Sequence, residues 1–378
     1  MATSIKILYH SRTFATGGAR VHIDQIVNNL IKCGCEVKIV EPVSGGRKSH
    51  KAILLSDIKS KLPSFVAEIL ELLYGFKAYR ELNKYNDIKL LYERHALFNL
   101  AGMWYAKKNK IPFFLEVNSP LAYEREKYGS LCFKKIAYML ERHVFEAADK
   151  IFCVSEKLKS ILVRYGLDPT NIIVNHNGVD KDYSIPTKDY NLVKKYDLEY
   201  KVVIGFVGYM LPWHGGDVLI KTLIKLFAEF ENIVFLLVGG IDCGVDLSIM
   251  NMYRDRFIII KNVDHDNIYN FINLFDVGVM AQSNDYGSPM KLIEYMGLGK
   301  AVIGPDTPAV REIIKNHETG ILVNPGDSED LYLKLSMLII NENERIYLGE
   351  NARSFIINNK MTWQDNARRI IDQYQLYK

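Results

Sequence analysis

Short apolar runs alternate with helix-like segments along the chain, and this alternation is the strongest constraint on its fold. Residues 5–9 form an apolar run, residues 21–31 have helical apolar spacing, and residues 36–40 alternate as a strand does. Such a strand, helix and strand predict parallel pairing, because a parallel connection needs a long crossover, which is usually a helix. The pattern therefore predicts the α/β class, with sheets covered by helices on both faces.

The strand candidates fall into two series separated by a polar stretch. The first series continues at residues 90–92, 113–117, 150–154 and 172–174, with a long helix predicted over 64–82; the second runs through residues 202–208, 234–238, 257–260, 277–280 and 301–303. We expect two Rossmann-like, doubly wound domains at residues 1–178 and 200–358, joined by a linker at 179–199. A chain of 378 residues is long enough for two such cores.

Composition narrows the class of protein further. No apolar run reaches the roughly 18 to 20 residues that span a bilayer, and the amino terminus resembles a strand more than a secretion signal, so we expect a cytoplasmic protein. The five cysteines contain no C-x-x-C pair, which predicts neither a disulfide framework nor a zinc site.

Charge is distributed unevenly between the two halves. Residues 1–178 carry a net charge of +10 and residues 179–378 a net charge of −6, which gives the total of +4. A basic half suggests an anionic partner such as a membrane surface, a phosphorylated acceptor or nucleic acid, although an uneven solvated surface explains the numbers equally well. Nucleic acid is the least favoured partner, because the positive charges are scattered among acidic residues.

Paired glycines, Gly17 and Gly18, follow the first strand candidate and precede a helix. Glycines let the backbone approach a ligand closely, and the helix amino terminus supplies N–H groups suited to phosphate. A tight turn without a ligand is an equal alternative. The spacing matches neither G-x-G-x-x-G nor G-x-x-x-x-G-K-[ST].

A second helix start lies after the strand candidate at 277–280. Ser288 is expected to cap this helix and Pro289 to be its first residue. Lys291 and Glu294 would share one face, and a cation near a helix start opposes the dipole unless an anion sits there. A nucleotide would supply that anion through its diphosphate, while Glu294 accepted hydrogen bonds from the ribose hydroxyls. The alternative is an exposed Lys–Glu pair of little energetic consequence.

Five segments together resemble one family. They are G-G at 17–18, N-H-N-G-V-D at 175–180, F-V-G-Y-M-L-P-W-H-G-G at 206–216, L-V-G-G at 237–240 and Y-G-S-P-M-K-L-I-E-Y-M-G-L-G-K-A-V at 286–302. The chain resembles the retaining glycosyltransferases of family 4, and most of all their bacterial exopolysaccharide and capsule members. The resemblance implies the GT-B fold: two Rossmann-like domains facing a cleft, with a final helix, at about 360–378, that crosses back to the first domain.

The family pattern also assigns the donor site, with two departures. Many members carry a glutamate seven residues before the one matched by Glu294, but here Tyr286 occupies that position with Asp285 beside it. Many also carry an Arg and a Lys after the strand at 202–208; neither is present, and Lys291 and His214 are the expected replacements. The donor-binding residues implied by the resemblance and the helix start are Gly17, Gly18, Gly208, His214, Tyr286, Gly287, Ser288, Pro289, Met290, Lys291 and Glu294.

The acceptor side is expected in the first domain, where polar residues follow two strand candidates. Arg94, His95, Glu116 and Asn118 are its candidate residues, and a purely structural Arg94–Glu116 ion pair is an equal alternative. The candidate catalytic residues are Glu116, Asn118, Lys291 and Asp285. The helical segment at 59–84 is expected either to lie on an anionic membrane or to pack in the core.

The resemblance implies transfer of a hexose from a UDP- or GDP-linked sugar to a glycan or lipid-linked oligosaccharide, in surface polysaccharide or glycoconjugate synthesis. It further implies retention of configuration without metal or another cofactor. Two alternatives stay open: a sugar-nucleotide epimerase of the same fold, which needs no acceptor, and a noncatalytic glycan-binding partner subunit.

Overall fold

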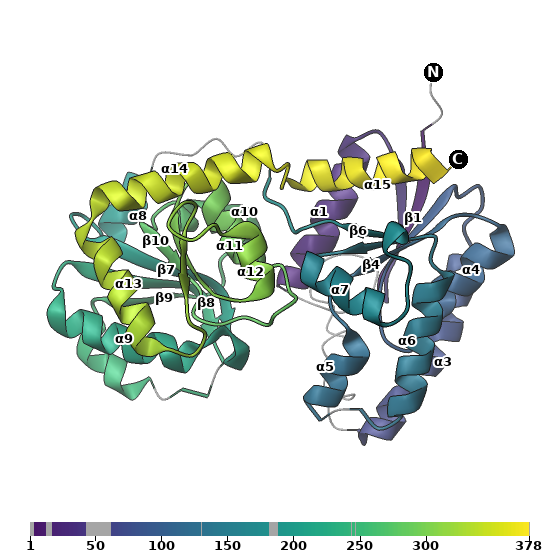
Figure 1. Cartoon of the computed structure of the whole chain (residues 1–378), viewed down its shortest axis with the longest axis horizontal. Coiled ribbons are helices and arrows are strands. Elements are labelled where there is room, and N and C mark those ends of the chain that lie inside the picture. The colour runs from purple at the N-terminus through teal and green to yellow at the C-terminus, as the bar shows by residue number, and fades with distance from the viewer. Residues whose placement is uncertain are drawn as a thin grey trace. The chain divides into compact units, whose positions relative to one another are not determined.

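The computed structural model of the chain describes residues 4–12, 17–42, 62–129, 131–180, 188–242, 244–245 and 247–377. Contacts between residues divide the chain into two compact units (Figure 1). Unit 1 comprises Met1–His176 and Gln364–Lys378, and unit 2 comprises Asn177–Trp363. The described part of the range 179–199, expected as a linker, is grouped with unit 2.

The described residues of unit 1 form a six-stranded parallel sheet with helices packed around it. The strands are β1 (Lys6–His10), β2 (Glu36–Val40), β3 (Leu90–Arg94), β4 (Phe113–Val117), β5 (Lys150–Cys153) and β6 (Ile172–Val174), in the order β2-β1-β3-β4-β5-β6. The helices are α1 (Gly18–Lys32), α3 (Ser64–Leu82), α4 (Ala101–Asn109), α5 (Leu121–Lys127), α6 (Lys134–Ala147), α7 (Glu156–Arg164) and α15 (Trp363–Tyr377). The last helix therefore belongs with the first domain, although it ends the chain.

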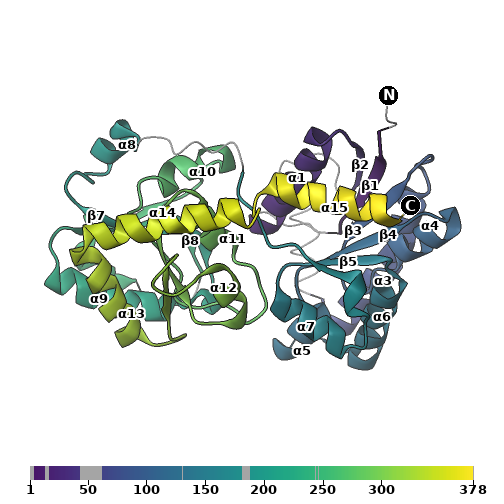
Figure 2. The same cartoon turned by 45° about the horizontal axis from the view of Figure 1, so that its top comes forward.

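Helix α15 lies beside the end of α1 (Figure 2). Its side chains hold it there by polar contacts: Asn366 donates to the His176 carbonyl over 2.7 Å, and the Tyr377 hydroxyl donates to Asp149 over 2.9 Å. The expected return of the final helix to the first domain is confirmed.

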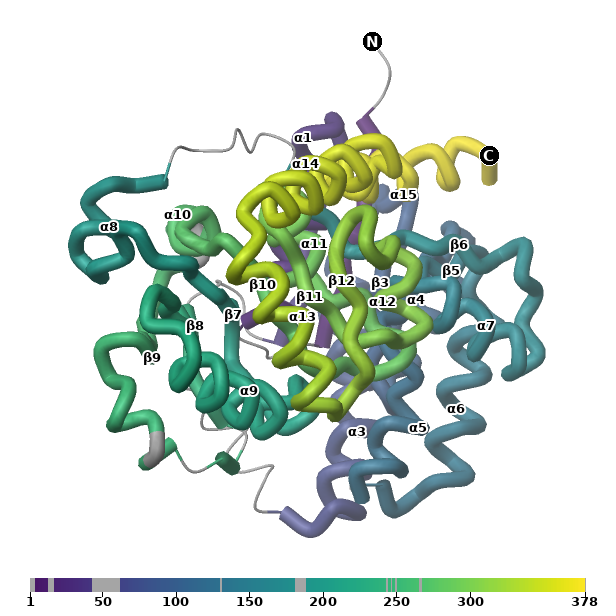
Figure 3. Tube along the Cα trace, turned by 60° about the vertical axis from the view of Figure 1, so that its left-hand side comes forward, coloured from purple at the N-terminus to yellow at the C-terminus, as the bar shows by residue number. Residues whose placement is uncertain are grey.

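Unit 2 repeats this architecture with a second six-stranded parallel sheet among its described residues (Figure 3). The strands are β7 (Val202–Met210), β8 (Ile233–Ile241), β9 (Phe257–Ile260), β10 (Val277–Val279), β11 (Ala301–Pro305) and β12 (Ile321–Val323), in the order β12-β11-β10-β7-β8-β9. The helices are α8 (Tyr190–Lys195), α9 (Gly216–Glu229), α10 (His265–Ile272), α11 (Met290–Gly297), α12 (Pro308–Ile313), α13 (Ser328–Ile340) and α14 (Glu342–Asn358).

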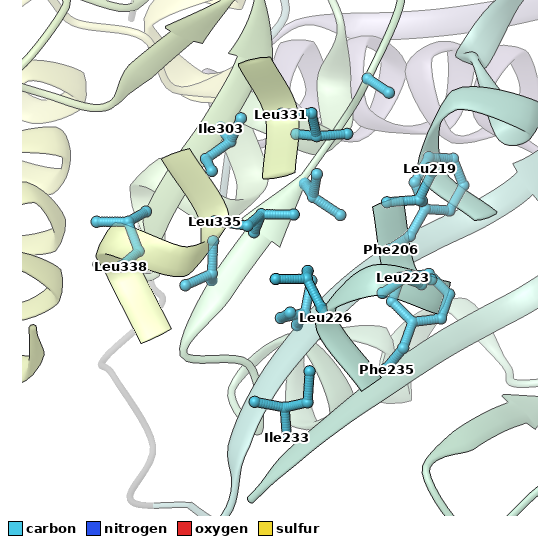
Figure 4. Packing of buried hydrophobic residues seen from close by; sticks show 14 of the residues in the cluster. Phe206, Leu219, Leu223, Leu226, Ile233, Phe235, Ile303, Leu331, Leu335 and Leu338 are labelled. Atoms are coloured by element: carbon cyan, nitrogen blue, oxygen red, sulfur yellow. The ribbon is translucent and has the colours of Figure 1, made fainter. Parts of the chain in front are cut away.

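Alternation along the strands divides the core of unit 2 into two layers. Phe206 and Phe235 point to one face, where they pack against leucines of α9 and α13 (Figure 4). Val207 and Leu236, one residue further along, point to the opposite face and pack with residues of α11 and α14. Because both faces are covered, these strands read as continuous apolar runs. The predicted doubly wound fold is confirmed.

The strand orders place a topological switch point in each sheet. In unit 1 the chain leaves β1 for β2 on one side and later adds β3 on the other. In unit 2 it runs from β7 to β8 and β9 before adding β10 on the other side. Ligands of such sheets bind beyond the carboxyl ends of the strands at this point. The ends of β1 and β3, and those of β7 and β10, are therefore where each unit is expected to hold a ligand.

One strand was missed, and two predictions about the start of α11 were wrong. Strand β12 was missed, because its three residues are too few to show a period. Helix α11 begins at Met290, with Pro289 as its cap residue, so Pro289 is not its first residue. Ser288 does not cap α11 either; its hydroxyl accepts a hydrogen bond from the Asn177 backbone N–H over 3.2 Å.

None of the described helices is both long and apolar enough to cross a membrane.

Candidate functional site

In unit 2 the chain beyond β7 brings His214 to the carboxyl end of the sheet. Pro212–His214 forms a short 3₁₀-helix, and Gly215 follows in the left-handed region with φ of 72°. A Cβ on Gly215 would lie 2.9 Å from the Gln282 Cβ, so both the conformation and the space require glycine. This close approach fixes the His214 segment against the segment that follows β10.

That segment, from β10 to α11, is held by hydrogen bonds to its own backbone. The Asn284 side-chain oxygen accepts from the Gly287 N–H over 2.6 Å, and the Asn177 side chain donates to the Ser288 carbonyl over 2.6 Å. Ser288 is 9 % exposed and Tyr286 is 7 % exposed. The start of α11 is therefore positioned by contacts that do not use its free N–H groups.

Lys291, in the first turn of α11, is half-buried against an aromatic ring. Its ammonium nitrogen lies 4.6 Å from the centre of the Phe206 ring and 3.2 Å from His214 Nε2. Burial lowers the pKa of Lys291 to about 8, although the nearby charge of Glu294 opposes this shift. Among the residues that the structure describes, Lys291 forms no ion pair with a carboxylate.

His214 is neutral, and its hydrogen bonds fix which nitrogen carries the proton. Burial, followed by repulsion from Lys291, lowers the pKa of His214 to about 3. The Leu211 backbone N–H donates to Nδ1 over 3.1 Å, so the proton of the neutral ring is on Nε2. Two donors, the His214 Nε2–H and the Lys291 ammonium, therefore face each other, and neither has an acceptor among the residues that the structure describes.

Glu294, one turn after Lys291, is only 5 % exposed. Burial raises the pKa of Glu294 to about 7, with Lys291 opposing the shift and Asp180 adding to it. The exposed Lys–Glu pair considered above is thus wrong, since neither residue lies on an open surface. A carboxyl group that titrates near neutrality can accept hydrogen bonds from hydroxyls when ionised.

The other predicted donor residues lie along the same end of the sheet or at the start of α1. Gly208 has φ of 96° and Gly17 has φ of 79°, and a Cβ on either, or on Gly18, would meet no described atom within 4 Å. Asp285 is exposed, and its carbonyl oxygen accepts from the Ala309 N–H over 3.1 Å. Pro289 and Met290, half-buried, bring the chain into α11.

In unit 1 the predicted acceptor residues converge on Glu116, which is 3 % exposed. Its Oε1 lies 2.6 Å from Arg94 Nη1, 2.7 Å from Asn118 Nδ2 and 3.0 Å from His22 Nε2. Burial alone would raise the pKa of Glu116, but the charges of His22 and Arg94 and these hydrogen bonds lower it to about 2. The Arg94–Glu116 ion pair anticipated as the structural alternative is present.

Arg94, His95 and Asn118 also line a cavity of about 290 Å³ at the carboxyl ends of the unit 1 strands. His95 Nε2 lies 3.1 Å from Glu141 Oε1, and the Nδ1 atom is buried without a hydrogen-bond partner among the described residues. Arg12 and Arg125 complete the basic side of this cavity. Three of the four predicted acceptor residues are thus brought to one surface, with Glu116 behind them.

Several residues of these clusters were missed from the sequence. His10 pairs with the buried Glu93, and Arg12 follows β1 into the cavity. His22 reaches Glu116 from α1. The position of Arg12 directly after the first strand was the available signal. The pairing of Asn177 with Ser288 joins residues too distant in sequence for any local pattern to show.

Comparison with known families assigns nearly the whole chain. Residues 16–183 match the family described as Glycosyltransferase Family 4, and residues 191–355 match Glycosyl transferases group 1. The chain belongs to these glycosyltransferase families. The two matches correspond to unit 1 and unit 2, so each Rossmann-like half of this glycosyltransferase has its counterpart in the family.

Individual relatives of this glycosyltransferase are distant. It is 23 % identical over 245 residues to the uncharacterized glycosyltransferase MJ1069 of Methanocaldococcus jannaschii, covering 62 % of this chain and 61 % of that protein. It is 25 % identical over 245 residues to the capsular polysaccharide biosynthesis glycosyltransferase CapM of Staphylococcus aureus, covering 61 % and 63 %. These alignments thus span only about three fifths of each relative's length.

Among solved structures, Alr3699/HepE of Anabaena in complex with UDP-glucose has a TM-score of 0.73 at 16 % identity, over 98 % of this chain and 99 % of that one. A likeness at this identity establishes the shared fold.

Proposed function

We propose that this glycosyltransferase moves a hexose from a UDP- or GDP-linked sugar to a glycan or lipid-linked saccharide, with retention and without metal. The observation that carries the donor part is the pair of facing donors in unit 2. The Lys291 ammonium and the neutral His214 ring lie 3.2 Å apart, and the described part of the chain supplies no acceptor to either. A diphosphate oxygen placed at this point would accept from both.

Glu294 supports the nucleotide assignment through a different group. Because burial holds its pKa near 7, the carboxyl group is largely uncompensated when ionised. Two ribose hydroxyls would satisfy it, and their hydrogen bonds would lower the pKa of Glu294 in the complex. UDP is the donor nucleotide that we favour, since the similar Alr3699/HepE was solved with UDP-glucose.

The proposed chemistry is electrostatic. Cleavage of the sugar–phosphate bond develops negative charge on the diphosphate, which Lys291, His214 and the N–H groups at the start of α11 would stabilise. Asp285 is exposed, and Glu116, with a pKa of about 2 and Oε1 already accepting from Arg94 and Asn118, is a weak base. We therefore propose that the leaving phosphate takes the proton of the acceptor hydroxyl, so that the sugar is transferred with retention.

The acceptor is proposed to bind at the unit 1 cavity lined by Arg94, His95 and Asn118. Surface polysaccharide or glycoconjugate synthesis is the process that we favour, because CapM, a relative of this chain, is named for capsular polysaccharide biosynthesis.

We also propose peripheral contact with an anionic membrane through α3. Phe65, Ile69, Leu73 and Phe76 recur at helical spacing and are 43 to 55 % exposed, while the exposed Lys107 lies nearby on α4. Such a face suits an acidic lipid surface. Leu73→Glu should lower the fraction of protein that floats with anionic vesicles, whereas Leu333→Glu, at an exposed leucine of unit 2, should not. Equal flotation of the wild type, Leu73→Glu and Leu333→Glu would contradict the proposed membrane contact.

Calorimetric titration tests the donor site. We expect UDP or GDP to bind, and Lys291→Ala to weaken binding by about 10- to 100-fold, the range for a hydrogen bond to a charged group. Glu294→Ala should also weaken it. Lys225→Ala, at an exposed lysine paired with Glu329, is the matched control and should bind normally. Unchanged UDP or GDP affinity in both Lys291→Ala and Glu294→Ala would contradict the proposed donor-binding site.

Turnover then separates transfer from the alternatives. Incubation with a nucleotide sugar and saccharide acceptors should release nucleoside diphosphate only when an acceptor is present. Conversion of the nucleotide sugar to an isomer without acceptor would indicate an epimerase.

A further inference from the structure

The cavity in unit 1 is lined by three arginines that come from three different elements. Arg12 follows β1, Arg94 ends β3, and Arg125 lies in α5. Its volume of about 290 Å³ is at the lower limit of the roughly 300 to 1,000 Å³ usual for small-molecule sites. A small group, such as the end of a larger molecule, therefore fits it best.

Two of these arginines are neutralised within unit 1. Arg94 Nη1 lies 2.6 Å from Glu116 Oε1, and Arg125 Nη1 lies 2.6 Å from Glu71 Oε2. Both pairs are largely buried, with 14 % of the Arg94 side chain and 23 % of the Arg125 side chain exposed. Arginine carries five N–H donors, so Arg94 has further donors beyond the one used in its pair. Arg125 Nη2 also lies 3.9 Å from Glu68 Oε1.

Arg12 is different. Its guanidinium lies 4.9 Å above the centre of the Tyr74 ring but forms no ion pair with any described residue. Its Nη1 atom is buried without a hydrogen-bond partner in the part of the chain that the structure describes. Burial lowers the pKa of Arg12, against the opposing effect of the charge on Glu71. A half-buried cation with a buried, unpartnered N–H group and no paired anion among the described residues is costly, so such a group points to an anion that arrives with a ligand.

We propose that this cavity binds a phosphoryl group carried by the acceptor, with Arg12 as its principal ligand. The proposal rests on the proposed function, because it names the chemical class of the acceptor. A phosphoryl group has several oxygens that accept from more than one direction, and arginine presents a planar set of donors that matches them. Arg94 would complete the set with the donors that it does not use in its pair, and Arg125 would add positive charge to the cavity wall.

His95 adds a contact for the saccharide next to that group. Its Nε2 lies 3.1 Å from Glu141 Oε1, and its Nδ1 is buried without a partner among the described residues. In the tautomer that places the proton on Nε2, Nδ1 is an acceptor. A sugar hydroxyl is a suitable donor for this position. The cavity would thus recognise a phosphoryl group and the first sugar attached to it.

The phosphoryl group could be carried by a soluble saccharide or by a lipid, and two titrations of the full chain distinguish these two ligands. Glucose 1-phosphate tests a soluble phosphorylated saccharide, and vesicles of phosphatidylcholine with phosphatidic acid test a phosphate borne by a lipid, against phosphatidylcholine alone. We expect one of the two to bind, and Arg12→Gln to weaken that binding by about 10- to 100-fold. Arg142→Gln, at an exposed arginine of α6 paired with Glu146, should bind as the wild type does.

Thermal unfolding checks that Arg12→Gln is folded; if it is not, Arg12→Lys, which keeps the charge and loses the planar fork, should still weaken binding. Failure of both probes to bind, or wild-type binding by the Arg12 variants, would overturn the proposal. So would binding that is lost in Lys291→Ala instead, because the phosphate would then occupy the donor site.

UDP affinity is measured on the same samples. Arg12→Gln should leave UDP affinity unchanged. A failure of the proposed donor site can therefore be distinguished from a failure of the proposed phosphoryl site in unit 1.

Discussion

The two units share a doubly wound parallel architecture, although their strand orders differ, and they treat one buried glutamate each in opposite ways. Glu116, at the end of β4 in unit 1, accepts from Arg94, Asn118 and His22, and its pKa is lowered to about 2. Glu294, in α11 of unit 2, forms no ion pair with Lys291, and its pKa is raised to about 7. The first charge is paired within the fold through Oε1, whereas the second is desolvated and only partly compensated by Lys291.

This difference separates a structural charge from one that waits for a ligand. The network around Glu116 pairs the carboxylate within the protein, so this group does not need a ligand to compensate its charge. Removing one member of the network would leave other buried groups unpaired. Lys291, His214 and Glu294 are all shifted toward their neutral forms, which is the state a bound diphosphate and ribose would reverse. In unit 1 the corresponding feature is Arg12 rather than the glutamate.

The largest expected effect is on stability, from the network around Glu116. Glu116→Gln removes the charge that Arg94 and His22 share and places amide donors against them. Breaking a buried pair in this way costs about 3 to 5 kcal/mol, so denaturant unfolding should show unit 1 destabilised by that order. Glu146→Gln, in the exposed pair with Arg142, should change stability by about 1 kcal/mol or less. A similar, small effect of both substitutions would abolish the contrast between the two glutamates.

The second effect is a difference in sign between the two glutamates as pH changes. Glu116, with a folded pKa of about 2 against an ordinary 4.5, contributes stability above pH 4.5 that is lost as pH falls toward 2. Glu294, with a folded pKa of about 7, does the reverse: the folded state binds the proton more tightly, so stability falls as pH rises from 4.5 to 7.

The stability of Glu294→Gln relative to the wild type should therefore increase as pH rises through this window, by on the order of 3 kcal/mol at most. Denaturant unfolding at pH 5 and pH 7.5 measures this difference. A constant difference between the two proteins across these pH values would show that Glu294 does not titrate there.

Much of this contrast is outside the reach of sequence reasoning. The strands followed from short apolar runs and the two domains from the two series of such runs, which are local signals, whereas the return of the last helix was implied by the family resemblance. Lys291 and Glu294 were found because they lie one turn apart on one helix. The burial of these two residues could not be predicted, because Phe206, which packs against Lys291, is 85 positions away in the chain.

The same holds for unit 1 and for the helix start. The Arg94–Glu116 pair was anticipated only as one of two alternatives, because strand neighbours β3 and β4 bring the residues together and the sequence alone does not give their register. Ser288 matched the preference for helix caps, but its hydroxyl accepts from Asn177, a contact formed only by folding of unit 2.

The third effect is on UDP binding across pH. Below about pH 7 Glu294 becomes protonated and loses an acceptor for the ribose hydroxyls; above about pH 8 Lys291 loses its charge. UDP affinity should be greatest between these values and fall on both sides, by up to about tenfold per pH unit. Lys291→Arg keeps its charge at high pH, so calorimetry should show that the alkaline fall disappears in that variant. Affinity independent of pH from 6 to 9 would argue against both contacts.

The smallest effect distinguishes a helix cap from a loop anchor. Ser155 caps α7 by accepting from the Leu158 N–H over 3.0 Å, whereas Ser288 accepts from the Asn177 N–H and makes no capping bond to α11. Alanine should cost about 1 kcal/mol at either serine, but for different reasons. Ser155→Ala should increase hydrogen exchange in the first turn of α7. Ser288→Ala should increase exchange at Asn177 and leave the first turn of α11 unchanged. Faster exchange there would restore Ser288 as a cap. It would also mean that the N–H groups at the start of α11 are partly engaged before any phosphate binds.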